Sequence, residues 1–535
     1  MGGATGLLSR PMLCAILALA LMLHLGMLAA GFQRLSSDEA ARVLMALSLT
    51  AENALEPWIW PPLHRWVLGL ALKLHEDPVW VPRLLSIATA LGLLMAILRL
   101  AARISGDARV VLAAAALALV TPYRLLLGTV PMADILMLLL LVAGAERVLA
   151  WLQKGRAGGR IGVLLAGCAL VGLATAVRYE AWFVAATLGA TLAWRWWRGQ
   201  GVPFGALAAA AVLLAGFPLF WIADSWIWYG SLNNLLITPE QFKAIAGDDA
   251  GRQALLLNPL GKPLWQELAW NPATWLGVAM LARLARRDAA LRDFASGFMT
   301  ALPLMGASML ATTAVSLAAT WRLVGIWSLL LLPFGALAFV RSAEWAAARL
   351  RLRGAPGAAA LAALLMLPAL ALPAVRDLRL IRAEMFNWET GTWRHDTEAG
   401  RAAVAELKRL GGSRVVVDSL GNIDFLDAMV GSGAPRLFVT SADAPAPMVA
   451  LYEPMAQHLR DIGDTARVEA YLADRFRLAA GGDPAALAAR GIRLALVRDA
   501  GVRAALDASP NAELVEAWPD WALYRFRPGP AVSAR

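Results

Sequence analysis

Eleven apolar segments follow one another over the first 375 residues of the chain, and this pattern restricts the fold to a membrane protein. Hydrophobic residues make up 59% of the sequence and charged residues only 16%. A membrane-spanning helix needs roughly 20 apolar residues, and most of the segments approach this length. The segments are 11–31, 82–101, 109–127, 131–150, 161–177, 181–197, 203–222, 267–283, 295–318, 323–340 and 356–375. The sequence therefore predicts a polytopic α-helical membrane protein with about 11 transmembrane helices. Residues 63–75 are too short and too charged for a span, and predict an amphipathic helix in the interface.

The charge of the connections alternates along the chain. One set is short and basic, with Arg103, Arg109, Lys154, Arg156, Arg160, Arg195, Arg198, Arg283, Arg286, Arg287, Arg292, Arg341, Arg349, Arg351 and Arg353. The other set carries Asp38, Glu39, Glu52, Glu56, Asp134, Glu180, Asp224, Glu240, Asp248 and Asp249. Because cytoplasmic loops are enriched in Lys and Arg, we expect the N-terminus in the cytoplasm and the acidic loops outside. Rich Ala, Leu and Arg usage favours a GC-rich bacterium, and so its inner membrane.

The region after residue 376 has a different pattern, and an odd number of spans would place it in the periplasm. RVVVDSL (414–420) and IRLALVRD (492–499) read as strands, and 448–478 has a helical pattern. ELVEAWPDWALYRF (513–526) reads as two short strands around a Pro-Asp turn. Strands that alternate with helices predict a small α/β domain. No G-x-G-x-x-G or P-loop follows the first strand, so we expect an accessory or acceptor-handling domain instead of a nucleotide site.

Composition also excludes several classes of function. The net charge of +10 comes from arginines and lysines between apolar segments, which is the positive-inside pattern and not that of a nucleic-acid-binding protein. The two cysteines, Cys14 and Cys168, both lie inside apolar segments, so no disulfide framework is expected. Cys, His and Asp do not cluster at metal-ligand spacing, so the spacing predicts no zinc or iron site.

The acidic connections hold the candidate functional residues. They are Asp38 and Glu39 after the first segment, Glu56, Trp60, His64 and Arg65 in EPWIWPPLHRW, Asp134 in TVPMAD, Arg178, Tyr179 and Glu180 in AVRYEAWF, and Arg322 in ATWRLV. Ionisable residues at membrane depth are costly and usually mark function. We expect the carboxylates and arginines to line one cavity at the outer face.

This combination of groups suits the transfer of a sugar from a lipid phosphate to a hydroxyl. A carboxylate can accept the proton of the acceptor hydroxyl. Arginine binds phosphate through a planar fork of donors and can stabilise it as a leaving group. A donor with a membrane-embedded tail explains a site at the bilayer boundary.

The motifs resemble those of the GT-C superfamily, and more narrowly glycosyltransferase family 39, the protein O-mannosyltransferases and bacterial lipid A aminoarabinose transferases. The resemblance rests on the Asp38-Glu39 pair after the first span, the PPL motif at 61–63 and Asp134 at the start of the fourth span, and it covers roughly residues 10–345. It implies a GT-C-like transmembrane domain over 1–375, with outer loops 32–81 and 223–266, and a C-terminal periplasmic α/β domain over 376–535.

The resemblance also implies chemistry. Relatives use polyprenyl- or dolichyl-phosphate sugars as donors and invert the anomeric centre. The base would be Asp38, with Glu39 beside it, and the other candidates would bind substrate. Relatives differ in metal use; two carboxylates and Asp134 could hold a divalent ion, but without a firm ligand set we predict no metal. Many relatives have His or Lys directly before the Pro-Pro pair, where this chain has Trp60, so the phosphate contact is expected to move to Arg178 or Arg322.

Each candidate also has a purely structural interpretation. Asp38 can cap a helix that begins with AARVLMALSL. Asp134 can pair with Arg124, and Arg178 with Glu180. Arg322 can anchor its helix to the interface, and His64 can belong to the interface instead of the site.

Two other functions stay open at the level of sequence. The predicted function is an inverting glycosyltransferase that moves a sugar from a polyprenyl-phosphate carrier to a hydroxyl of an envelope glycan, lipid or protein. A transporter or flippase of lipid-linked saccharides is the alternative from another class, although repeated halves and broken midplane helices are not evident. A GT-C-like oligosaccharide ligase or polymerase is the third.

Overall fold

The computed structural model describes most of the chain. The described residues are 7–32, 38–51, 54–55, 60–154, 159–229, 270–305, 325–351, 355–387, 392–393, 396–411, 414–417, 424–439, 484–489 and 491–527. The chain divides into two compact units. The first consists of Met1–Phe32, Leu55–His64 and Ser86–Arg382, and the second of Gln33–Ala54, Arg65–Leu85 and Ala383–Arg535. The helical pattern predicted at 448–478 lies outside the described residues.

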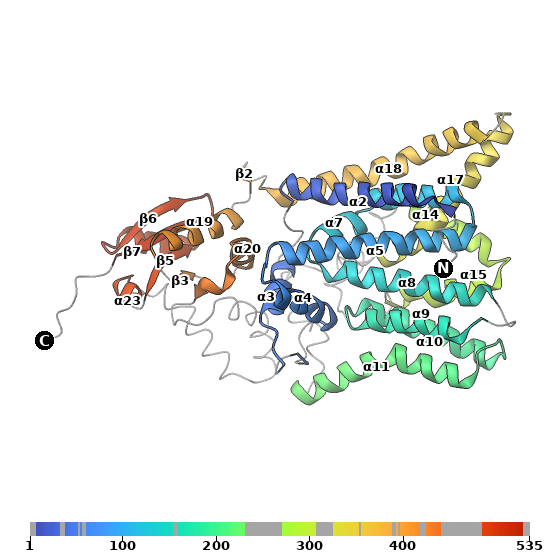
Figure 1. Ribbon diagram of the computed structural model, residues 1–535, viewed down its shortest axis with the longest axis horizontal. Helices are drawn as coiled ribbons and strands as arrows, with labels where there is room; N and C mark the ends of the chain where they lie inside the picture. Colours follow the sequence, from blue (N-terminus) through green and yellow to red (C-terminus); the bar gives the residue numbers. More distant parts are fainter. Residues whose placement is uncertain are drawn as a thin grey trace, which may run out of the picture. The chain divides into compact units, whose positions relative to one another are not determined.

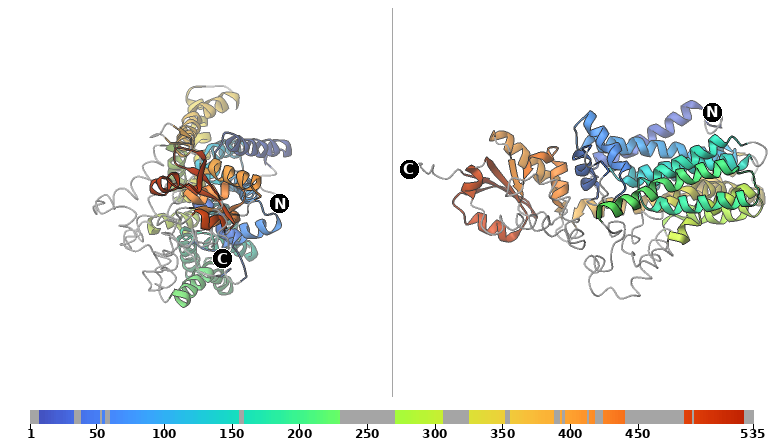
Figure 2. Two further views of the ribbon diagram at one scale, coloured as in Figure 1. Left: turned by 90° about the vertical axis from the view of Figure 1, so that its left-hand side faces the viewer. Right: turned by 90° about the horizontal axis from the view of Figure 1, so that it is seen from below.

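The first unit is a bundle of helices that run alongside one another (Figure 1; Figure 2, right). Its helices are α2 (Arg10–Ala29), α5 (Trp80–Ser105, in this unit from Ser86), α6 (Ala108–Val120), α7 (Pro122–Thr129), α8 (Ala133–Gln153), α9 (Ile161–Thr175), α10 (Glu180–Trp197), α11 (Phe204–Tyr229), α14 (Pro272–Ala285), α15 (Ala289–Phe298), α17 (Gly325–Arg349) and α18 (Ala355–Met385). α8 packs on α9, α9 on α11, and α14 on α17.

The helices have the length and apolarity of membrane spans, which confirms the predicted fold class. Among the described residues, six helices are long and apolar enough to cross a membrane, or seven if the bent pair α6 and α7 forms one span. In α17 89% of the apolar window is buried inside the protein, against 11% in α2 and 17% in the window of α18. α17 is therefore a core helix, and α2 and α18 present apolar surface outward. The count of eleven stays a prediction.

Close helix packing in the bundle depends on glycine. A Cβ built on Gly335 of α17 would overlap the carbonyl oxygen of Ala273 in α14, and one on Gly277 of α14 would overlap that of Leu331 in α17. Small residues let helix backbones approach in membrane proteins, where hydrophobicity alone does not drive helix association. Two buried hydrogen bonds of 2.8 Å add to the contact, from Asn271 Nδ2 to Ser328 Oγ and between the hydroxyls of Thr274 and Ser328.

The predicted span 109–127 is broken into α6 and α7, which meet at an angle of 49°. Pro122 begins α7, and proline cannot continue the hydrogen-bond ladder of the preceding helix. Arg124, fully buried, donates from Nε to Ala118 O at 2.7 Å and from Nη2 to Leu119 O at 3.0 Å. Its Nη1 lies 3.0 Å from Nε2 of buried His24 in α2. Arg124 thus satisfies two carbonyl groups in the last turn of α6, as a break in a membrane-spanning helix requires.

The second unit contains the C-terminal α/β domain, which confirms that prediction. Its sheet has the order β4-β3-β5-β7-β6; β3, β4 and β5 are parallel, and β7 pairs antiparallel with β5 and β6. The elements are β1 (Phe386–Asn387), β2 (Thr392–Trp393), α19 (Asp396–Arg409), β3 (Arg414–Val417), α20 (Asp424–Gly431), η4 (Pro435–Leu437), β4 (Phe438–Val439), α23 (Pro484–Ala489), β5 (Ile492–Val497), α24 (Ala500–Asp507), β6 (Ala512–Ala517) and β7 (Ala522–Phe526).

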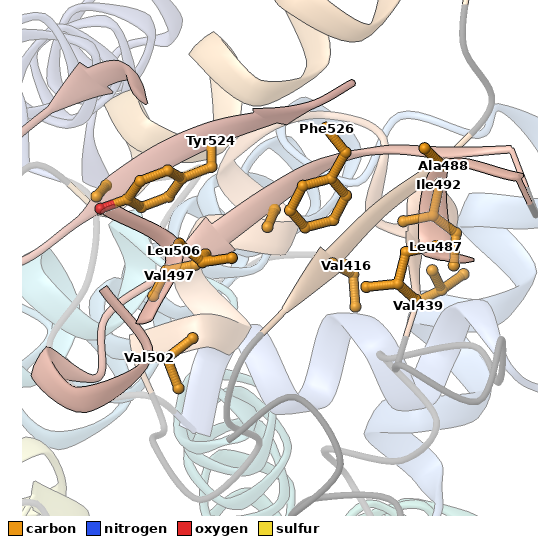
Figure 3. Packing of buried hydrophobic residues seen from close by; sticks show 12 residues of the cluster. Val416, Val439, Leu487, Ala488, Ile492, Val497, Val502, Leu506, Tyr524 and Phe526 are labelled. Carbon is orange, nitrogen blue, oxygen red and sulfur yellow. The ribbon is translucent and has the colours of Figure 1, made fainter. Parts of the chain in front are cut away.

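The core of this domain lies between the sheet and its helices. Val416, Val497, Val502, Tyr524 and Phe526 belong to one buried cluster, which Figure 3 shows between strands and helices. α19 packs against β3, β5 and β7. β5 reads as a nearly continuous apolar run, as expected of a strand that is covered on both faces. The two strands predicted around a Pro-Asp turn are β6 and β7.

The second unit also includes two helices of the first loop, α3 (Asp38–Leu47) and α4 (Leu63–Leu74, in this unit from Arg65). The amphipathic helix predicted at 63–75 is present as α4. The helix predicted after Asp38 is α3, which begins at Asp38 itself.

Candidate functional site

Asp134, Arg178 and Glu180 form a buried cluster in the helical unit. Arg178 Nη1 donates to Asp134 Oδ2 at 2.9 Å, and its Nη2 donates to Glu180 Oε1 at 2.6 Å. Its Nε lies 3.1 Å from both carboxylate oxygens of Glu180. The side chains of Asp134, Arg178 and Glu180 are 3%, 14% and 12% exposed, so the bulk solvent screens these pairs little.

Local structure explains why these residues meet. Asp134 lies in the first turn of α8, and Glu180 is the first residue of α10. A carboxylate is stabilised in the first turn of a helix by the positive end of the helix dipole. Arg178 stands in the short reversal between α9 and α10, from where it reaches the N-termini of both α8 and α10. With one cation and two carboxylates, the cluster has a formal charge of −1.

The reversal between α9 and α10 is held by further hydrogen bonds. Trp182 Nε1 donates to Thr175 O at 2.9 Å, and Arg178 N donates to Ala174 O at 3.2 Å. Leu63 N donates to Ala176 O at 2.8 Å, which ties the end of the first loop to the same reversal. The structure therefore brings the segment that contains buried Pro61, Pro62 and His64 to a point two residues before Arg178 in the chain.

An aromatic group lies beside this reversal. Tyr179 and Trp182 make an edge-to-face contact with ring centroids 5.2 Å apart. Trp221 Nε1 donates to Tyr179 Oη at 3.1 Å, and Phe217 stacks on Trp221 at 5.6 Å. Trp221 is fully buried, and a buried indole N–H needs an acceptor. Sequence reasoning missed Trp221 because one tryptophan within an apolar span gives no signal that distinguishes it from an interfacial one.

The other predicted site residues lie elsewhere or outside the described part. Asp38 and Glu39 begin α3 in the second unit, where Glu39 is 3% exposed. Arg65 of α4 is buried in that unit, and Trp60 is half-buried in the first. Glu56 and Arg322 lie outside the described residues.

Arg178 and Glu180 form the ion pair that their structural interpretation predicted, and Asp134 belongs to the same cluster. For Arg124, the structure shows contacts with His24 and with two carbonyl groups of α6. Among the described residues, no three His, Cys, Asp or Glu side chains are arranged so that they could hold a metal ion.

A different set of ion pairs lies toward the C-terminal end of α8 and between other helices of the bundle. Glu146, which follows Asp134 by twelve residues or about 18 Å of helix, accepts from Arg103 Nη2 of α5 at 2.8 Å. Arg109 of α6 bonds to Glu344 of α17 at 2.6 Å, and Arg195 of α10 pairs with Asp293 of α15. These pairs join neighbouring helices in the part of the chain where the basic connections lie.

Solved structures of similar fold exist for this chain. It matches ArnT from Cupriavidus metallidurans bound to undecaprenyl phosphate with a TM-score of 0.56 and 15% identity, over 97% of this chain and 98% of that one. The apo state of ArnT from Cupriavidus metallidurans gives a TM-score of 0.54 and 14% identity over the same shares. The apo Archaeoglobus fulgidus oligosaccharyltransferase gives 0.48 and 11% identity, over 91% of this chain and 70% of that one.

No protein-family model matches the sequence, and no curated protein matches it. The likeness to ArnT is one of fold, and it extends over both the helical bundle and the C-terminal domain because nearly the whole of each chain is covered. The chain thus shares the overall fold of ArnT, a fold of the kind that its sequence motifs predicted.

Proposed function

We propose that this protein is an inverting glycosyltransferase of the bacterial inner membrane. It moves a sugar from a polyprenyl-phosphate carrier to a hydroxyl of an envelope glycan, lipid or protein at the periplasmic face. The observation that carries the proposal is the buried Asp134–Arg178–Glu180 cluster at the N-termini of two helices. The fold shared with an ArnT structure that contains undecaprenyl phosphate supports the class of donor.

In the proposed reaction Asp38 is the general base, a role that rests on the resemblance. Its carboxylate takes the proton of the acceptor hydroxyl as that oxygen attacks the anomeric carbon. The bond from the anomeric carbon to the phosphate oxygen breaks on the opposite side, so the configuration inverts. Polyprenyl phosphate leaves with the electron pair of that bond. Glu39 is the next residue in the chain and supplies a second carboxylate in the first turn of α3.

The cluster is assigned to the substrate sugar. Carboxylate oxygens accept hydrogen bonds from sugar hydroxyls, and bonds to charged acceptors are the stronger kind. Arg178 fixes Asp134 and Glu180 in orientation, since it donates to both. Tyr179, held by Trp221, supplies an aromatic ring and a hydroxyl beside them.

The leaving phosphate is assigned to a different cation. A phosphate at Arg178 would have to compete with two carboxylates, in a cluster whose formal charge is already negative. Of the two arginines that the sequence offered for this contact, the proposal therefore favours Arg322, with His64 and Arg65 of the first loop as the second choice. The proposed contact is electrostatic stabilisation of developing negative charge.

The proposed orientation follows from charge. Basic residues lie at the end of α8 that carries Glu146, and the acidic cluster lies at its other end. By the positive-inside rule the basic end faces the cytoplasm, so the cluster faces the periplasm. The C-terminal domain is assigned to the periplasm from the expected odd number of spans.

Turnover by the purified full-length protein tests this function. The assay supplies undecaprenyl-phosphate sugars and a mixed pool of envelope acceptors, and it measures release of undecaprenyl phosphate. Asp38→Asn is expected to lower kcat by about 10²- to 10⁴-fold, the usual contribution of a general base. Asp107→Asn is the matched control, because Asp107 caps α6 and Asn is as good a cap. Absence of turnover with every lipid-linked sugar would contradict the proposal.

A further inference from the structure

The C-terminal domain contacts the helix on which the proposed base stands. α3 and α20 pack against each other within the second unit (Figure 1). A buried cluster joins Val43 and Ala46 of α3 to Leu68 and Leu72 of α4, and Val430 of α20 packs against this cluster. Leu68 and Leu72 of α4 are thus covered by protein, including a side chain from a position more than 350 residues later in the chain.

α20 is itself firmly fixed in the C-terminal domain. Ala428 and Met429 are fully buried, and α20 packs on α19 so closely that a Cβ on Gly400 would overlap the carbonyl oxygen of Ala428. Asp427 and Val430, three residues apart, share one face of α20. Asp427 of α20 is 8% exposed and Arg42 of α3 is 4% exposed, so each of the two helices buries a charged residue.

α3 and α4 pack closely against each other. Gly69 of α4 lies against the end of α3, since a Cβ there would be 2.6 Å from Leu49 Cδ2 and 3.1 Å from Ala46 O. Trp66 Nε1 donates to Ala54 O at 2.7 Å, which ties the connection between the two helices to α4. Arg436 Nε donates to Glu76 Oε1 at 2.9 Å, a second link from the C-terminal domain to the end of the α4 segment.

We propose that α20 positions α3, and with it Asp38 and Glu39, so that the C-terminal domain is part of the catalytic apparatus without contacting the reacting atoms. Val430 is the positioning residue: its apolar side chain fixes the rotation of the α3–α4 pair. The part of this inference that concerns catalysis rests on the proposed function, whereas the part that concerns the placement of α3 does not.

Hydrogen exchange of the full-length protein in lipid nanodiscs tests the placement without an activity assay. Val430→Asp puts a charge into the apolar cluster, and Leu514→Asp puts the same charge on an exposed position of β6. We expect Val430→Asp to speed exchange in peptides from 38–47 and 65–74 by about tenfold or more, with β5 peptides unchanged, because local opening is governed by buried apolar contacts. Leu514→Asp should leave 38–47 unchanged. Equal protection of α3 in both variants would overturn the proposal.

A second variant covers the case in which Val430→Asp disrupts the whole domain. Val430→Thr keeps the branched shape and exchanges one methyl group for a hydroxyl, which costs less to bury than the carboxylate of Val430→Asp. It should loosen α3 while β5 stays protected, and Val430→Ile should protect α3 as the wild type does. Loss of protection in β5 together with α3 for Val430→Thr would show that Val430 only stabilises its own domain, which contradicts the proposal.

Turnover then connects placement with catalysis. Val430→Asp is expected to lower kcat by about 10- to 100-fold with little change in KM for the lipid donor, since a small misplacement of a reacting group has costs of this size. Leu514→Asp should retain wild-type kcat. Wild-type kcat in a Val430→Asp protein with a loosened α3 would refute the catalytic part. A wild type without turnover would instead refute the proposed function, and the exchange result would stand by itself.

Discussion

Arg178 and Asp134 form an ion pair of 2.9 Å between the α9–α10 reversal and the first turn of α8, where Asp134 is buried and the side chain of Arg178 is 14% exposed. The two residues are 44 positions apart in the chain, and Glu180 binds the other side of the same guanidinium. The ion pair therefore links α8 to the α9–α10 reversal, and solvent screens it little. Its removal should affect stability and, under the proposed function, substrate binding.

Arg178→Leu should strongly destabilise the helical unit. The substitution removes the guanidinium that donates to Asp134 and Glu180, and loss of one partner from a buried pair costs about 3–5 kcal/mol. The measurement is thermal unfolding of the detergent-solubilised protein, followed by tryptophan fluorescence. Arg109→Leu is the control, because Arg109 is 49% exposed and exposed pairs are worth about 0–1 kcal/mol. Equal unfolding temperatures for the two variants would show that the cluster does not hold the helices.

Asp134→Asn should weaken transfer while it preserves the shape of the cluster. The variant removes one negative charge and so raises the formal charge of the cluster from −1 to 0. Loss of a charged acceptor is expected to lower kcat/KM for the sugar donor by about 10- to 100-fold, from the 1.5–3 kcal/mol that such bonds contribute. Asp293→Asn makes the same change in the Arg195 pair at the other end of the bundle. An equal effect of both variants on kcat/KM would point to stability and not to binding.

Gly335→Ala should separate α17 from α14. The added Cβ overlaps the carbonyl oxygen of Ala273, and backbone on both sides leaves no flexible side chain to move. Overpacking of this kind costs about 1–3 kcal/mol. Gly216→Ala in α11 is the matched control, since a Cβ there meets nothing within 4 Å and alanine favours helix by up to about 1 kcal/mol. The unfolding temperature should fall for Gly335→Ala and hold or rise for Gly216→Ala; the reverse order would contradict the packing argument.

Most of the fold could be predicted because its signals are local. Apolar runs marked the helices, and RVVV and IRLALV marked β3 and β5 in their observed places. The pairing of Arg178 with Glu180 was foreseeable from their spacing of two residues at a helix start. The position of Asp134 followed from the expectation that the fourth and fifth spans are antiparallel, because the start of the fourth span and the end of the fifth then lie at one end.

What sequence could not predict depends on long-range packing. Pro122 signalled a break, but the use of Arg124 to satisfy the carbonyl groups of Ala118 and Leu119 requires the bend itself. The bond from Trp221 to Tyr179 joins α11 to the residue before α10, positions 42 apart in the chain. The amphipathic pattern of α4 predicted that its apolar residues contact the membrane interface. In the structure two of them, Leu68 and Leu72, contact α3 and Val430.

Tyr524 gives a prediction for the alkaline range that concerns only the C-terminal domain. Burial, together with its hydrogen bond of 2.8 Å to Asp507, raises the pKa of the Tyr524 hydroxyl from 10.0 to about 12. Because the neutral hydroxyl is the favoured form in the folded state, its contribution to stability is complete below pH 10 and is lost as the pH rises from about 10 to about 12.

Spectrophotometric titration of the full-length protein should therefore show one tyrosine that ionises near pH 12, and Tyr524→Phe should remove that step. Hydrogen exchange in β7, referenced at each pH to the intrinsic rate, should show protection falling over this range in the wild type and less so in Tyr524→Phe. A late step that survives in Tyr524→Phe would assign it to another tyrosine and contradict the prediction.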